Sequence, residues 1–398
     1  MGEIKEKALI LNTSHNDIGL IRALKDMGYY VVAIGAKSGL MGERLVDEYR
    51  QLDYSDKESV LCLADELGIS AICSCCNDLG VLTAAYVAER LGLPGHDSYE
   101  VTETLHDKGK FKKFASEFGI KTPQAEVFTN AEEAFAYVHN ASHFPLMVKA
   151  SDLSAGNGIS KVSSPDEAQR AVENAFAKSR KKRIVVEPFV EGTQHAICAF
   201  LLDGKVVAAG SNNEYSYINP YRVEIDTYPA RDFELVRDFL IGQIEKMASV
   251  LNLVDGIFEM QYILTPEGDA WILECMRRVL GNMYGIPSSN LMGFNWDYWE
   301  ARCHCGLDCA EFPVGATEKG YYAYRALIAK NDGVFSGLEV SDTVRSYVTE
   351  EVMLKELGEK IIDHGSDPIG FLFFSFPSRE VMDYVMIDSY DEVRIQVV

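Results

Sequence analysis

Two glutamates, Glu259 and Glu274, are the residues whose placement points most clearly to chemistry. They lie in segments 255–264 and 270–278, which are rich in aromatic and branched residues and are separated by the turn-forming sequence Pro-Glu-Gly-Asp. A four-residue turn places Gln261 opposite Glu274, so Glu259 lies diagonally from Glu274 on the same face of the hairpin. Two carboxylates held that close among apolar residues repel each other. Mg2+ takes oxygen ligands and would remove the repulsion, so the pair is a first sign of a magnesium–nucleotide enzyme.

The size and charge of the chain narrow the class of protein. With 398 residues it is too long for one hydrophobic core, so two or three domains are expected. It carries 38 basic and 60 acidic residues, and this net charge of −22 argues against nucleic acid or an anionic membrane as a main partner. No apolar run reaches the roughly 18 residues that a transmembrane helix needs. The polar start is unlike a signal peptide, so we expect a cytoplasmic protein.

The nine cysteines are expected to be reduced and mostly buried in such a chain. One cluster, Cys303, Cys305 and Cys309 with His304, has the ligand types of a zinc site but lacks paired C-x-x-C knuckles. Packing of small side chains is the interpretation we favour, and a zinc site is the alternative.

Residues 8–94 alternate short apolar runs with helical patterns, which predicts parallel strands in an open α/β sheet. Ligands bind such sheets at the carboxyl ends of the strands, where His15, Asn77 and Asp78 follow two of them. These residues are candidates for substrate contact; the alternative is that the asparagine and aspartate side chains there cap the next helices. The expected strands are 8–11, 30–34 and 71–74, and the expected helices are 18–27, 56–67 and 79–91.

A second unit begins near Asp107, which is expected to cap a helix over 108–118. Lys149 ends a buried strand, and the loop 151–160 that follows has glycines at 156 and 158. Glycines let backbone N–H groups approach phosphate oxygens, and a neighbouring lysine supplies a positive charge. A plain surface turn is the alternative.

A strand over 184–187 runs into an extended linker, Pro188 to Gly192. Its backbone is able to meet an adenine edge, although Pro188 has no N–H to donate. The alternative is a strand between lobes with a partly buried Glu187. Further helices are expected over 131–139 and 233–251.

In order, these motifs resemble the ATP-grasp superfamily, in particular its biotin carboxylase and carbamoyl-phosphate synthetase-like members. The resemblance rests on Asp-Lys before a helix, Val-Lys before a glycine-rich loop, Glu-Pro-Phe-Val-Glu-Gly, and two hairpin glutamates followed by arginine. It implies an α/β (α+β) fold: an N-terminal parallel α/β pre-ATP-grasp domain over 1–106, a two-lobed ATP-grasp core over 107–313 with a small lid lobe at about 123–190, and a small C-terminal α+β lobe over 314–398.

The resemblance also implies roles for matching positions. Lys108 and Lys149 would contact the phosphates of ATP, and Glu259 and Glu274 would hold Mg2+, with Mn2+ as a substitute. Arg278 would steady the substrate carboxylate or acyl phosphate. The other implied nucleotide-binding residues lie in the closing loop, the adenine linker and the ribose position: Ser154, Gly156, Gly158, Glu187, Pro188, Phe189, Val190 and Gln194.

One position departs from the family pattern, because Met276 stands where an asparagine usually follows the second glutamate. Methionine is a poor magnesium ligand, so a second metal site would be weaker or would use Gln261 or Asn282. The implied activity is ATP-dependent carboxylate–amine ligation: a carboxylate attacks the γ-phosphate, and an amine then displaces phosphate from the acyl phosphate. The alternatives are an ATP-dependent carboxylase of the biotin or purine-precursor type and a non-catalytic ATP-binding regulator.

The small-molecule acid and amine are not identified by the sequence. The tyrosine-rich segment 211–231 is expected to border the acceptor pocket, with Arg222 able to hold an anionic group; a packed surface loop is the alternative. Arg277, Asn77 and Asp78 are further candidates for substrate contact. Base rates favour a homodimer.

Overall fold

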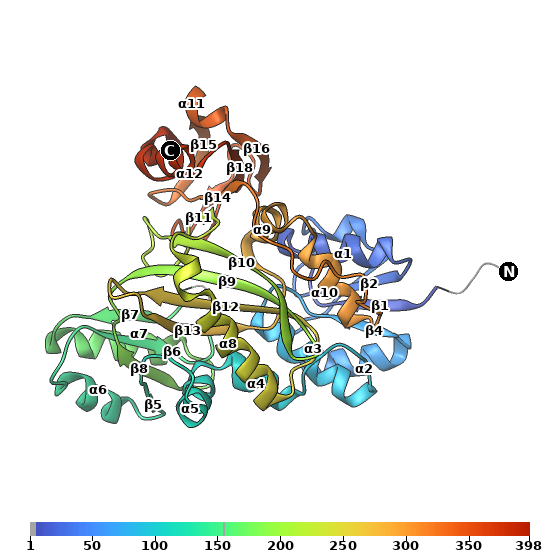
Figure 1. Cartoon of the computed structure of the whole chain (residues 1–398), viewed down its shortest axis with the longest axis horizontal. Coiled ribbons are helices and arrows are strands. Elements are labelled where there is room, and N and C mark those ends of the chain that lie inside the picture. Colours follow the sequence, from blue (N-terminus) through green and yellow to red (C-terminus); the bar gives the residue numbers. More distant parts are fainter. Residues whose placement is uncertain (1–4, 154–155) are drawn as a thin grey trace.

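The computed structural model describes residues 5–153 and 156–398. Its strands form four sheets, and the largest runs through the centre of the molecule with smaller sheets on either side of it (Figure 1).

The N-terminal region is a four-stranded parallel sheet in the order β3-β2-β1-β4. The expected alternation of strands and helices is confirmed, and the short edge strand β3 was not expected because its residues are mostly polar. Asp56 caps α2, and Gly92 ends α3 in the left-handed conformation. The elements are β1 (Lys7–Ile10), α1 (Ile18–Asp26), β2 (Tyr30–Gly35), β3 (Glu48–Gln51), α2 (Lys57–Leu67), β4 (Ala71–Cys73) and α3 (Asp78–Leu91).

Two helices lead from this region into a small antiparallel sheet. Asp107 caps the second helix, as expected, by accepting a hydrogen bond from the Lys110 N–H. The sheet has four strands in the order β5-β8-β6-β7, and two helices pack on it over a small apolar core. These elements are α4 (Tyr99–His106), α5 (Lys108–Phe118), β5 (Glu126–Phe128), α6 (Ala131–His139), β6 (Leu146–Ala150), β7 (Ile159–Val162), α7 (Ala168–Lys178) and β8 (Ile184–Pro188).

The central sheet has eight strands in the order β13-β12-β9-β10-β11-β14-β18-β16. Helix α8 packs its buried residues against this sheet, in a core shared with α5. The first part of the sheet consists of β9 (Thr193–Leu202), β10 (Lys205–Tyr215), β11 (Ile225–Tyr228), α8 (Phe233–Leu251), β12 (Gly256–Leu264) and β13 (Ala270–Met276), followed by α9 (Gly285–Met292) and α10 (Trp296–His304).

The C-terminal residues complete the central sheet and add a three-stranded sheet, β17-β15-β19. Strand β14 pairs with β11, so the central sheet continues across the expected boundary at 313/314. The division into domains stays a prediction. The elements are β14 (Tyr321–Leu327), β15 (Gly333–Val340), α11 (Asp342–Arg345), β16 (Val348–Met353), β17 (Lys360–Ile361), β18 (Gly370–Phe376), α12 (Arg379–Asp383) and β19 (Val393–Val397). In the described part of the chain, no helix combines the length and apolar character needed to span a membrane.

Candidate active site

The hairpin β12–β13 carries the two glutamates on the floor of a cavity. Its register pairs Gln261 with Glu274 and Glu259 with Met276, as the diagonal arrangement requires. The turn differs from the expected four-residue loop, because Leu264 pairs with Ala270. A bulge beside Gln261 shifts the register by one residue and restores the expected pairing at Glu274. Both glutamates therefore line the same cavity.

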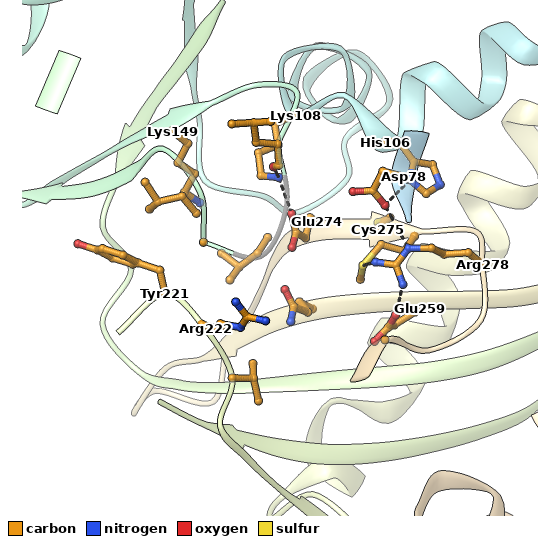
Figure 2. Close-up of a pocket in the computed structure, with 18 of the residues that line it drawn as sticks. Asp78, His106, Lys108, Lys149, Tyr221, Arg222, Glu259, Glu274, Cys275 and Arg278 are labelled. Atoms are coloured by element: carbon orange, nitrogen blue, oxygen red, sulfur yellow. Dashed lines mark hydrogen bonds and ion pairs between the residues drawn. The ribbon is translucent and has the colours of Figure 1, made fainter. Parts of the chain in front are cut away.

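The cavity has a volume of about 370 Å3 and lies between the central sheet, the small antiparallel sheet and the N-terminal region. Figure 2 shows Lys149, Tyr221 and Arg222 on one side of it, Asp78, His106 and Arg278 on the other, and the Lys108–Glu274 pair between them. The sequence-predicted residues that line it are Asn77, Asp78, Lys108, Lys149, Gly156, Gln194, Arg222, Glu259, Glu274 and Arg278.

The two glutamates differ in charge environment. Glu274 lies 2.8 Å from Lys108 Nζ, and this ammonium lowers the pKa of Glu274 although burial alone would raise it. Glu259 is 6% exposed, and its nearest cation is Arg278, with Nη1 4.0 Å from the carboxylate. Burial, reinforced by the nearby Glu214 carboxylate, raises the pKa of Glu259 to about 7. The negative charge at this end of the cavity is thus incompletely compensated.

The oxygen atoms on this face of the hairpin fit a hard divalent cation bound together with phosphates. Glu259, Glu274 and the amide oxygen of Gln261 offer oxygen atoms from one face of the hairpin. Within residues 5–153 and 156–398, no group of three or more His, Cys, Asp or Glu side chains is arranged to hold a metal. Mg2+ is commonly held by one or two carboxylates and takes its remaining ligands from substrate phosphates and water, so two glutamates suffice for it.

Lys149 belongs to a buried charge cluster that the sequence only partly indicated. Its ammonium group donates to one oxygen of Glu187, and Lys112 Nζ lies 2.8 Å from the other. Although burial alone would raise the pKa of Glu187, the two lysines lower it to about 2. Lys149 lines the cavity, whereas Lys112 and Glu187 lie behind it. Lys112 follows Lys108 by four residues on α5, which is its one sequence signal.

The residues expected to meet adenine are not part of this cavity lining. Glu187 is turned inward to the two lysines. Pro188 and Phe189 are exposed, and Lys161 Nζ lies 3.7 Å above the ring of Phe189. Val190 is half-buried. The roles of the linker 188–190 and of Glu187 toward adenine remain predictions.

Arg278 is held in place by a carboxylate and a histidine. Its Nε donates to Asp78 Oδ1 at 3.1 Å, and His106 Nδ1 lies 3.2 Å from the same oxygen. Because His106 Nε2 accepts from the Arg277 N–H at 3.2 Å, its Nδ1 is the protonated nitrogen. Burial would raise the pKa of Asp78, but Arg278 and His106 lower it. Sequence reasoning missed His106, since only the fold brings the end of α4 beside Asp78.

Arg277 does not line this cavity, and its expected contact with substrate stays a prediction. It is 8% exposed, its Nε donates to Asp97 at 2.9 Å, and its Nη2 donates to the Val254 carbonyl at 2.6 Å. Successive residues after a strand point to opposite sides, so Arg278 faces the cavity and Arg277 the interior.

Two candidates from the N-terminal region have different positions. Asn77 caps α3, which was the alternative to substrate contact, and it also lines the cavity. His15 packs against Phe371 outside this cavity.

The loop after β6 is tied to the tyrosine-rich segment. Ser154, one of the predicted phosphate-binding residues, lies outside the described residues. Gly156 has φ +74°, and a Cβ there would lie 2.5 Å from the Tyr221 carbonyl oxygen. Gly158, at φ +71°, packs against Ala150. The Lys161 N–H donates to the Tyr221 hydroxyl at 2.8 Å. The segment therefore does border the cavity, with Tyr221 against the glycine loop.

Arg222 and Gln194 occupy two further walls. Arg222 Nη1 donates to the Ser366 carbonyl at 2.6 Å, which leaves other guanidinium donors for a ligand. Gln194 Nε2 donates to Glu214 at 2.6 Å. Burial raises the pKa of Glu214 to about 7.

The cysteine cluster lies apart from the cavity. Cys303 Sγ is 3.6 Å from Cys309 Sγ, and Cys305 interacts with Cys73.

Comparison with known proteins adds an independent line of evidence. The family model of the phosphoribosylglycinamide synthetase ATP-grasp (A) domain matches residues 106–219. The phosphoribosylamine–glycine ligase of Archaeoglobus fulgidus is 32% identical over 139 residues, which are 34% of this chain and 28% of that protein. The chain spans less than a third of the length of the first curated relatives that it matches.

Solved structures match over the whole chain. L-amino acid ligase from Bacillus licheniformis has a TM-score of 0.83 at 18% identity and covers 100% of both chains. The biotin carboxylase domain of Hydrogenobacter thermophilus 2-oxoglutarate carboxylase, in complex with magnesium ADP and bicarbonate, has a TM-score of 0.79 at 19% identity. It covers 100% of this chain and 92% of that one. At such identities the matches establish the fold and not the reaction.

Proposed function

We propose that this chain, which belongs to the ATP-grasp superfamily, is an ATP-dependent carboxylate–amine ligase. The reaction would form an amide or peptide bond through an acyl phosphate and release ADP and phosphate. One observation carries the proposal: Lys108, Lys149, Glu259, Glu274 and Arg278 line a single cavity. These are the charges that phosphoryl transfer from a triphosphate to a carboxylate requires.

In this proposal the lysines bind the triphosphate. Lys108 comes from the first turn of α5 and Lys149 from the end of β6, so they reach the cavity from two elements. Lys108 Nζ also donates to the Leu153 carbonyl at 2.8 Å, which fixes the start of the glycine loop over the cavity. The loop 151–160, including Ser154, would close over the β- and γ-phosphates and exclude water.

Glu259 and Glu274 would hold Mg2+, or Mn2+ in its place, and the ion would supply positive charge at the phosphate oxygens. The raised pKa of Glu259 supports this assignment, because an incompletely compensated buried carboxylate is stabilised by a cation. Met276 faces Glu259 across the hairpin and donates no hard oxygen, so any second metal would depend on Gln261 or Asn282.

Arg278 would orient the substrate carboxylate for attack on the γ-phosphorus. A carboxylate oxygen would form the new P–O bond while ADP leaves; the amine would then bond to the acyl carbon, lose a proton and displace phosphate. Asp78 and His106 position Arg278, because Asp78 accepts from its Nε and His106 holds Asp78. Arg222 and Asn77 both line the cavity, and we assign them to the acid and amine co-substrates.

The proposal is tested by a phosphate-release screen with Mg2+ and ATP over pairs of carboxylates and amines. We expect release that needs both partners, together with a product whose mass equals the two substrates minus water. Matched reactions with bicarbonate and no amine test the carboxylase alternative. Bicarbonate-dependent ADP formation without amide product would contradict the ligase proposal, and magnesium–ATP binding with no ADP formed over the whole panel would favour a regulator.

The proposal also covers the cellular compartment and the oligomeric state. All nine cysteines are free thiols, which supports a reducing compartment such as the cytoplasm. We also propose a homodimer, which sedimentation equilibrium would test against a monomer.

A further inference from the structure

A second cavity lies in the C-terminal part of the molecule and takes no part in the proposed reaction. Its volume is about 310 Å3. The described residues that line it do not overlap with those of the first cavity. Strand β14, the residues after it and strand β19 form most of its wall, in the orange and red part of Figure 1. Two residues of the segment before β11, Ile218 and Glu224, close it.

Arg325 of β14 is a buried cation whose charge lacks a direct counter-ion. It is 5% exposed, and among the described residues no carboxylate lies within ion-pair distance of it, although Glu224 attracts it from farther away. Its Nη1 donates to the Tyr390 carbonyl at 2.9 Å, and its buried Nε has no hydrogen-bond partner in the described structure. The guanidinium lies 4.3 Å from the centre of the Tyr390 ring. Burial lowers the pKa of Arg325. A buried guanidinium in this condition is stabilised by an anionic ligand.

The rim of the cavity does not supply that anion. Asp391 is exposed and paired with Lys330 at 3.3 Å, with both side chains more than two-thirds exposed. Arg394 Nε donates to the Asp391 carbonyl at 2.9 Å. The rim therefore carries two further cations, which favours the approach of a carboxylate.

Glu224 supplies the opposite charge within the same cavity. It is buried, and it accepts hydrogen bonds from the Tyr390 hydroxyl at 2.7 Å and from the Ile218 N–H at 3.3 Å. Burial raises the pKa of Glu224. The Tyr217 N–H also bonds to it, and since a carboxylate has about four acceptor sites, about one remains for a ligand cation. The rest of the lining is largely apolar: Ile218, Ala326, Leu327, Ile328, Val393, Ile395 and Val397.

A single ligand class matches a cation, an anion and an apolar wall. We propose that this second cavity binds a small apolar α-amino acid, with its carboxylate at Arg325 and its ammonium group at Glu224. Arg325 and Glu224 already attract each other. An acid without the ammonium group would therefore use only the Arg325 donors, and an amine without the carboxylate would use only the Glu224 acceptor.

The site is also placed to act on the first cavity. Residues 218–224 run between the two: Ile218 and Glu224 line the second cavity, and residues 220–223 line the first. Tyr217, at the start of this stretch, stacks on Tyr390 with ring centres 4.2 Å apart. Binding at Arg325 and Glu224 would therefore act on Tyr221, whose backbone lies against Gly156 of the glycine loop. The ligand is an effector in this view, and its binding does not depend on the ligase activity.

Calorimetry on the full chain without nucleotide tests the proposal, with L-leucine as the probe. We expect L-leucine to bind, and 4-methylpentanoate and 3-methylbutylamine, which each lack one charge, to bind at least about tenfold more weakly. Arg325→Met is expected to weaken leucine binding about thirtyfold or more. Arg345→Met removes an exposed arginine of the same region that pairs with Glu351, and it is expected to leave binding unchanged.

A second variant guards against misfolding of Arg325→Met. Ile395→Trp fills the cavity from its half-exposed wall while keeping Arg325, and it should abolish the same binding. Circular dichroism melts check that each variant is folded. Wild-type leucine affinity in a folded Ile395→Trp protein, no binding by wild type at millimolar leucine, or equal binding of 4-methylpentanoate would overturn the proposal.

Nucleotide affinity tests the effector role. Leucine should shift the magnesium–ATP dissociation constant of wild type and not that of Arg325→Met; no shift in wild type would overturn that role. This test is separate from the ligase proposal, because leucine binding is measured without nucleotide or turnover. Lys149→Met should abolish any ligase turnover and leave leucine binding at Arg325 intact, and wild-type protein without ligase activity could still bind leucine.

Discussion

Replacing Lys149 by methionine separates the binding of ATP from the stability of the fold. Lys149 and Lys112 hold the two oxygens of the same buried glutamate, Glu187, but only Lys149 lines the first cavity. Methionine keeps the length of the side chain and removes its charge. The matched control is Lys112→Met, which removes the other lysine of the cluster from a position behind the cavity.

The expected size of the effect follows from Coulomb's law. A lysine ammonium about 4 Å from a phosphate charge interacts by about 4 kcal/mol at an effective dielectric constant of about 20. Lys149 is 11% exposed, so solvent screens it little. Losing that interaction corresponds to about a thousandfold in affinity as an upper limit. Glu187 keeps one lysine in either variant, so each should fold.

Titration calorimetry with magnesium–ATP measures the affinities, and thermal melts measure stability. We expect Lys149→Met to bind magnesium–ATP about 100- to 1,000-fold more weakly than wild type. We expect Lys112→Met to melt at a lower temperature, because it leaves the buried Glu187 carboxylate with one partner fewer. We expect it to retain ATP affinity within about a factor of ten, because Lys112 does not line the cavity. Wild-type ATP affinity in Lys149→Met, or equal losses of affinity in both variants, would refute the assignment of Lys149 to the phosphates.

Three further predictions concern other parts of the site. The pKa of Glu187 is lowered from 4.5 to about 2, so its stabilisation of the fold is complete well above pH 4.5 and is lost as pH falls toward 2. Unfolding measured at pH 6 and pH 3 should show wild type losing about 2 kcal/mol more than Glu187→Gln, and parallel curves would contradict this. Gly156→Ala should weaken magnesium–ATP binding, because its Cβ would meet the Tyr221 carbonyl oxygen at 2.5 Å; calorimetry equal to wild type would show that the loop adapts. Arg277→Met should destabilise the fold by about 3–5 kcal/mol in urea unfolding, because it leaves the buried Asp97 carboxylate without its ion-pair partner. The ATP affinity of the folded protein should stay unchanged, and loss of affinity without loss of stability would indicate that Arg277 contacts a substrate.

Much of the fold was predictable because local signals and tertiary packing agree. The helix over Phe233–Leu251 and the helix over Ala131–His139 have the bounds expected from their apolar spacing. Asp107 caps α5 as expected, which fixes Lys108 in the first turn beside the cavity. The alternation of strands and helices before residue 94 likewise gave a parallel sheet. These features depend on residues close together in the chain.

The parts that were missed depend on contacts between distant residues. His106 ends a helix, and only the approach of α3 and β13 gives it Asp78 and the Arg277 N–H as partners. Lys112 looks like an exposed helical lysine in the sequence, yet the small antiparallel sheet covers it and supplies Glu187. The sequence does not state which of two adjacent arginines faces the cavity; in the structure Arg278 lines it, whereas Arg277 donates to Asp97.

The central claim is that a divalent cation joins Glu259 and Glu274 to the phosphates of a nucleotide. Anomalous diffraction from crystals grown with Mn2+ and ADP tests it most directly, because manganese is located without reference to the protein model. We predict a peak at coordination distance from both carboxylates and from a phosphate oxygen of ADP. Bound ADP with no peak there, or with manganese away from both glutamates, would contradict the account.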